Sequence, residues 1–145
     1  MRIATTTESA ATGSPRIVLL LGSNVDADAQ LDRALALLAQ EFGLLAVSAR
    51  LRSAATCPGA PDYANQAALL RCALDHAALK PRLRRIESAL GRQRPAADPR
   101  LCPIDIDAVG RYAPDFELWD TDAHAAAYAW PVLAELGVPG RSGKE

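Results

Sequence analysis

One apolar stretch, residues 103–110, carries two carboxylates inside a sequence that is otherwise typical of a buried strand. Side chains on a β-strand repeat every second residue, so Asp105 and Asp107 project from one face. Ile104 and Ile106 then enter the core. Two like charges this close repel, and a divalent cation such as Mg²⁺, which takes oxygen ligands, would offset the repulsion. The alternative is a solvated outer face of an edge strand, an ordinary place for charged side chains.

The net charge and the cysteines give no indication of a nucleic-acid-binding, membrane-binding, zinc-binding or disulfide-bonded protein. The chain has 145 residues, 50% of them hydrophobic, which suffices for one domain with its own core. A net charge of -1 gives no reason to expect nucleic acid or an anionic membrane as a partner. The cysteines have no C-x-x-C spacing and indicate neither a zinc site nor a disulfide framework; they are Cys57, Cys72 and Cys102. We therefore expect a reduced, cytoplasmic protein.

The composition along the chain predicts one domain between two tails. Residues 1–15 are rich in Thr, Ser and Ala without the apolar core of a signal peptide, which predicts a flexible N-terminal tail. Residues 137–145 are rich in Gly and Pro and predict a flexible C-terminal tail. The domain then spans residues 16–136. No run approaches the length needed to cross a bilayer.

Hydrophobic periodicity predicts alternating strands and helices within this domain. Strands are expected at residues 16–21, 45–51, 63–74 and around the two aspartates. Helices are expected from a cap at Asp26 or Asp28 to residue 42, at 79–90, and at 130–136. The order predicts an α+β fold, a ferredoxin-like sandwich with helices packed mainly on one face of an antiparallel sheet.

Four motifs together resemble the 6-hydroxymethyl-7,8-dihydropterin pyrophosphokinase family of folate biosynthesis. They are Gly22-Ser23-Asn24, Pro61-Asp62-Tyr63-x-Asn65, Arg85-Ile86-Glu87-x-x-x-Gly91-Arg92-x-Arg94 and Ile104-Asp105-Ile106-Asp107. The similarity runs from about residue 16 to residue 133. It implies a ferredoxin-like fold and transfer of pyrophosphate from ATP to the hydroxymethyl oxygen of a reduced pterin, with two Mg²⁺ ions. The resemblance also implies small-molecule partners only, and we expect a monomer.

The resemblance assigns metal and pterin roles to individual residues. Asp105 and Asp107 match the Mg²⁺ ligands and are expected to be catalytic. Tyr63 matches an aromatic wall of the pterin pocket and Asn65 a donor and acceptor to the heterocycle. Three further residues are expected beside the pterin: Ser23, Asn24 and Ser53. The ordinary alternatives are a core position for Tyr63 and a turn that only caps a helix for Ser23 and Asn24.

The resemblance places a second group of residues beside the nucleotide. Arg92 and Arg94 match a basic loop over ATP, and Arg92 is expected to be catalytic by meeting a phosphate oxygen. Their alternative is a solvated charged loop. Ile106 is also assigned to the nucleotide side. Glu87 receives a secondary nucleotide role, because a glutamate on a helix face is more often simply exposed.

The chain departs from the family pattern in the loops around these motifs. Pro99 and Cys102 occupy positions where the family has a tryptophan and an arginine. Candidate replacements are His124 for a missing histidine, Tyr128 for a second pterin wall, and Arg100 or Arg111 for a phosphate contact. Three hypotheses follow: an active pyrophosphokinase with rebuilt loops, a relative that uses another pterin or phosphoryl donor, and a non-catalytic pterin-binding module.

Overall fold

The computed structural model describes residues 14–55 and 57–140. Residues 1–13 of the predicted N-terminal tail and residues 141–145 of the predicted C-terminal tail lie outside the described residues. The strands are β1 (Arg16–Ser23), β2 (Gly43–Val47), β3 (Leu51–Ser53), β4 (Tyr63–Arg71), β5 (Asp105–Tyr112) and β6 (Phe116–Leu118). The helices are α1 (Ala27–Glu41), α2 (His76–Ala89), α3 (Thr121–Ala125) and α4 (Trp130–Glu135). None of the described helices is long and apolar enough to span a membrane.

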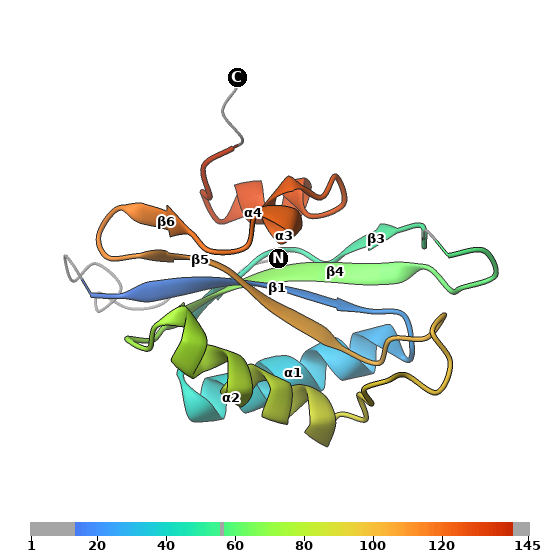
Figure 1. Cartoon of the computed structure of the whole chain (residues 1–145). Helices are drawn as coiled ribbons and strands as arrows, with labels where there is room; N and C mark the ends of the chain where they lie inside the picture. The colour runs from blue at the N-terminus through green and yellow to red at the C-terminus, as the bar shows by residue number, and fades with distance from the viewer. Residues whose placement is uncertain (1–13, 56, 141–145) are drawn as a thin grey trace.

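The described strands form one antiparallel sheet in the order β2-β4-β1-β5-β6. The short strand β3 pairs with the first residues of β4, and β2 pairs with the last residues of β4. Figure 1 shows the two long helices, α1 and α2, on one face of this sheet and the short helices α3 and α4 on the other. The α+β prediction, with helices mainly on one face, is confirmed. The sheet has an open edge at the N-terminal half of β5, because β6 pairs only with residues 110–112.

The central strand β1 explains why both faces of the sheet are covered. Ile17, Leu19 and Leu21 alternate with Val18 and Leu20, and all five are buried. The first three pack against α1 and α2, while the other two pack against α3 and α4. The continuous apolar run of this central strand therefore contributes to two cores, because alternate side chains enter the core on opposite faces of the sheet.

The strand predicted at residues 45–51 is divided in two. The hydroxyl of Ser48 accepts a hydrogen bond from the backbone N–H of Ala67 at 2.9 Å, and the backbone N–H of Ser48 donates to the Ala67 carbonyl at 2.9 Å. This side chain takes a backbone partner in the ladder, so β2 ends and β3 begins three residues later. The predicted side-chain cap at Asp26 is also wrong, since Asp26 has a φ of 52° and makes no cap hydrogen bond.

The C-terminal half of the domain holds elements that the pattern did not predict. The segment after the aspartate strand forms β6 and α3, and the Asp120 carboxylate accepts a hydrogen bond from the backbone N–H of Ala123 at 3.0 Å to begin α3. Within the predicted C-terminal tail, Val138 is buried in the core under α3 and α4. The described residues thus continue to pack beyond α4.

Candidate active site around the aspartate strand

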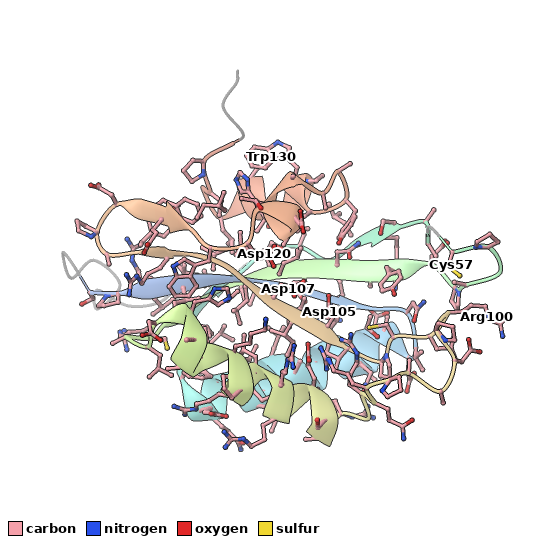
Figure 2. All side chains as sticks on the ribbon, viewed as in Figure 1. Cys57, Arg100, Asp105, Asp107, Asp120 and Trp130 are labelled. Carbon is pink, nitrogen blue, oxygen red and sulfur yellow. The ribbon has the colours of Figure 1, made fainter. Side chains whose placement is uncertain are left out.

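The two aspartates lie on β5, where the sheet is paired on one side and open on the other. Asp105 pairs in register with Gly22 and Asp107 with Leu20 on β1. Figure 2 shows Asp105 and Asp107 following one another along the strand. As the alternation predicted, Ile104 and Ile106 are buried in the core, at 0% and 5% exposure. Alternation along β5 therefore sends the two carboxylates toward the opposite face.

Asp107 lies in a strongly acidic environment. Burial, and then the neighbouring carboxylates of Asp105, Asp120 and Glu87, raise the pKa of Asp107 to about 8. Asp120, from the connection into α3, lies above the strand in Figure 2. Repulsion of this kind is relieved either by a proton or by a cation.

The donor set fits Mg²⁺ held jointly with a substrate. The described residues contain no group of three or more His, Cys, Asp or Glu side chains suited to a metal ion. Mg²⁺ commonly takes only one or two protein carboxylates and completes its shell with waters and substrate phosphates. Asp105 and Asp107 supply such a pair, and their mutual repulsion favours a divalent cation between them.

Glu87 ties helix α2 to the open edge of β5. Its side chain is only 1% exposed, unlike most glutamates on a helix face. Oε2 accepts a hydrogen bond of 2.7 Å from the backbone N–H of Ile106, the residue between the two aspartates. Oε1 lies 3.0 Å from Nη1 of Arg94 as an ion pair, without hydrogen-bond geometry. The carboxylate thus satisfies a strand N–H that no neighbouring strand reaches.

Arg92 connects the same glutamate to the first aspartate. Its Nη1 donates to Oδ1 of Asp105 at 3.1 Å and to the Ile104 carbonyl at 2.9 Å. The same nitrogen lies 3.6 Å from Glu87 Oε2. Arg92 therefore braces Asp105 in this structure, in addition to bordering the cavity described next.

A cavity of about 340 Å³ opens on the side of the sheet that carries the carboxylates. Its polar lining brings together predicted residues from three strands and a loop: Ser53, Tyr63, Asn65, Arg92, Asp105 and Asp107. The amide nitrogen of Asn65 donates to the Ser53 hydroxyl at 2.8 Å. Gly22 forms part of the same wall, and a Cβ there would lie 3.3 Å from Asn65 Oδ1. A flat heterocycle could bind between these groups and the apolar side chains opposite.

Two of the predicted pterin residues lie behind this cavity instead of in its wall. Ser23 is fully buried, and its hydroxyl donates to the Val25 carbonyl at 3.1 Å within the turn after β1. Asn24 is 5% exposed, and its amide hydrogen-bonds the backbone of residues 100–102. The polar atoms of both side chains thus form hydrogen bonds with the backbone of the neighbouring loops.

A second, smaller cavity of about 170 Å³ lies at the open edge of β5. The predicted nucleotide residues Glu87, Arg94 and Ile106 line it. Sequence reasoning missed the remaining charged groups of its wall, which are Lys80 and Arg84 on α2 and Asp120 before α3. The signal for the two cations was the helical spacing of Lys80, Arg84 and Glu87, which follow one another at intervals of four and three residues along one face. Asp107 borders both cavities.

Comparison with known protein families matches residues 18–138 to 7,8-dihydro-6-hydroxymethylpterin-pyrophosphokinase (HPPK). The chain belongs to the HPPK family. No curated protein matches the chain. Membership confirms the predicted resemblance and supports pyrophosphoryl transfer in folate biosynthesis, with ATP and a pterin as the family's small-molecule substrates.

The positions that depart from the HPPK pattern fall into two groups. Pro99 and Cys102 line the larger cavity, and so does Tyr128, which reaches it from the α3–α4 connection. Burial raises the pKa of Tyr128, and so does the negative charge of the nearby carboxylates of Asp105, Asp107 and Asp120. Tyr128 thus adds a second aromatic side chain to the wall that contains Tyr63.

The other candidate replacements point elsewhere. His124 is buried, with Nε2 2.8 Å from the Pro139 carbonyl oxygen. Arg100 is exposed at the outer end of its loop (Figure 2) and pairs with Asp98 at 2.9 Å. Arg111 pairs with Glu117 at 3.0 Å. None of these three side chains borders either of the two cavities.

Proposed function

We propose that the protein transfers pyrophosphate from ATP to 6-hydroxymethyl-7,8-dihydropterin in a Mg²⁺-dependent reaction. The position of Asp107 carries this proposal, because this residue borders both cavities. One cavity has an aromatic and amide lining suited to a pterin. The other carries three cations that could bind a triphosphate, beside three carboxylates that could share a divalent cation with it. A reaction that joins a group of one ligand to the other would take place at their common border.

The larger cavity would hold the pterin. Tyr63 and Tyr128 provide aromatic surface for the ring, and the Asn65 carbonyl oxygen is left for a heterocycle N–H because the amide nitrogen is bound to Ser53. The side chains of Asp105 and Asp107 line the same cavity. The hydroxymethyl group of a bound pterin would extend toward them.

The smaller cavity would hold the nucleotide. Lys80, Arg84 and Arg94 supply positive charge for the phosphate oxygens, and Ile106 supplies apolar surface. Asp105 and Asp107 would hold two Mg²⁺ ions, which when bound neutralise phosphate charge and lower the pKa of the attacking hydroxyl. Arg92 and Glu87 keep the two carboxylates in place through Asp105 and the Ile106 backbone.

The chemical step then follows from this arrangement. The hydroxymethyl oxygen gives up its proton to solvent and forms a bond to the β-phosphorus of ATP, and the bond between the β-phosphorus and the α–β bridging oxygen breaks. AMP leaves with that oxygen. The protein's contribution is to align the three atoms and to balance charge, since phosphoryl-type transfer requires little covalent help from side chains.

Formation of AMP tests the proposal directly. The purified protein is incubated with ATP, Mg²⁺ and 6-hydroxymethyl-7,8-dihydropterin, alongside an Asp105→Ala/Asp107→Ala variant. Asp115→Ala, which removes an exposed carboxylate from the β5–β6 turn, is the matched control. Pterin-dependent AMP that is lost in the double variant and kept in the control supports the proposal. Equal turnover in all three proteins refutes the assignment of the two aspartates.

Two simpler measurements separate the remaining hypotheses. Pterin binding without AMP formation and without stabilisation by Mg²⁺–ATP indicates a binding module, because a ligand stabilises only a state that it binds. AMP formation with a different pterin alone indicates a relative with altered specificity. We also propose a cytoplasmic monomer, which light scattering and cell fractionation test.

A further inference from the structure

The loop between α2 and β5, residues 91–103, forms one wall of the larger cavity. It contributes Arg92, Ala96, Pro99, Leu101 and Cys102 to the lining. The loop contains neither helix nor strand. A segment without its own ladder of hydrogen bonds keeps a defined shape only if side chains from the rest of the fold hold it.

A buried glutamine on α1 ties the two ends of this loop together. Gln30 is 6% exposed on the core-facing side of the helix. Its Nε2 donates to the Leu90 carbonyl at 2.7 Å and to the Pro103 carbonyl at 3.2 Å. These carbonyls stand at the start and the end of the loop, so one amide group fixes the separation of its stems.

Asn24, at the end of β1, holds the second half of the same loop. Its backbone N–H donates to the Cys102 carbonyl at 3.0 Å, and its Oδ1 accepts from the Cys102 N–H at 2.7 Å. Its Nδ2 donates to the Arg100 carbonyl at 2.8 Å and to the Pro61 carbonyl at 3.4 Å. Pro61 belongs to the loop before β4, so one side chain links both loops to the end of β1.

We propose that Asn24 and Gln30 are positioning residues that hold loop 91–103 against the larger cavity. The role of that cavity as a pterin pocket rests on the proposed function. Neither side chain lines the cavity. Their effect passes through the backbone of residues 100–103, which sets where Leu101 and Cys102 stand in the wall and where β5 begins.

The two anchors act through hydrogen bonds that few other side chains can supply. A carboxylate at position 24 keeps an acceptor for the Cys102 N–H but faces the Arg100 carbonyl with a second acceptor. A leucine at position 30 fills similar space and leaves the partly buried carbonyls of Leu90 and Pro103 without their donor. Asn24→Asp and Gln30→Leu therefore remove the bridging function while changing side-chain volume little.

Limited trypsin digestion tests the anchoring without any ligand. Trypsin can cut after Arg100, whose side chain is exposed but whose carbonyl is bound by Asn24. We expect Asn24→Asp and Gln30→Leu to raise the rate of this cleavage about tenfold, because losing about one net hydrogen bond shifts a local opening equilibrium by that order. Gln40→Leu, at an exposed position of the same helix, is the matched control and should cleave at the wild-type rate.

Ligand titration of the same proteins tests the consequence for the cavity. With Mg²⁺ and a non-hydrolysable ATP analogue present, we expect the Kd for the pterin to rise roughly tenfold in both variants. Circular dichroism confirms that each variant is folded. Wild-type cleavage rates in folded variants overturn the anchoring, and faster cleavage with an unchanged Kd overturns the positioning role. If the wild-type protein binds no pterin, the proposed function fails, and the cleavage rates alone still decide the anchoring.

Discussion

Replacing Glu87 should reveal how much of the stability of the aspartate strand comes from helix α2. Glu87→Ala leaves the Ile106 N–H without its 2.7 Å acceptor at a buried position, which costs about 1–3 kcal/mol. The ion pairs with the partly exposed Arg92 and Arg94 add about 0–1 kcal/mol. We therefore expect a loss of roughly 1–4 kcal/mol in the free energy of unfolding.

A second substitution separates the hydrogen bond from the charge. Glu87→Gln keeps a carbonyl oxygen for the Ile106 N–H, while its NH2 group replaces the oxygen that pairs with Arg94, so its cost should be about 1 kcal/mol. Arg85→Ala, at an exposed position of the same helix, controls for helix propensity. Urea unfolding followed by far-UV circular dichroism gives the three values. A glutamine variant as unstable as the alanine variant would refute the reasoning, since the strand hydrogen bond could not then be the main term.

Three further predictions concern the sheet, the metal-free site and the pterin wall. Gly110→Ala should lower stability by about 1–3 kcal/mol in urea unfolding, because its Cβ would lie 2.5 Å from the Glu117 carbonyl oxygen; an unchanged midpoint would contradict this packing. The pKa of Asp107 is raised to about 8, so the metal-free folded state keeps a proton that the unfolded chain releases, and stability should fall as pH rises toward 8. Melting curves across this pH range should show a fall in stability of about 1–3 kcal/mol, a value already reduced for the partial exposure of Asp107. The fall should be absent in Asp107→Asn, and Mg²⁺ should oppose it. A wild-type stability that does not change with pH would contradict the prediction. Tyr63→Ala should weaken pterin binding by about 10- to 100-fold in a fluorescence titration, and an unaltered affinity would make Tyr63 a packing residue.

The strand around the aspartates was predictable because its pattern is local. A period of two over five residues is enough to place Asp105 and Asp107 on one face and Ile104 and Ile106 in the core. The long helices were predictable for the same reason, from apolar residues repeating at helical spacing. Short elements such as α3 were not, because five residues carry too little periodicity to separate a helix from a loop.

Glu87 illustrates what local pattern cannot reveal. Its neighbours Leu83 and Ile86 mark the buried stripe of α2, and a glutamate beside that stripe is usually solvated. Its burial depends on the open edge of β5, which presents an unpaired N–H at Ile106. That edge exists only because β6 pairs further along the strand, a fact of tertiary arrangement.

The sequence by itself determined the α+β fold, the family and the pairing of two carboxylates on one strand, since each depends on residue type and short spacing. Tertiary structure decided which side chains face which cavity. It bonded the Asn24 side chain to the backbone of residues 100–102, placed Tyr128 at the larger cavity, and brought Lys80 and Arg84 into the smaller cavity beside the aspartate strand. These placements depend on how distant segments pack, because the direction of a side chain relative to a site is set by the elements around it and not by its neighbours in the chain.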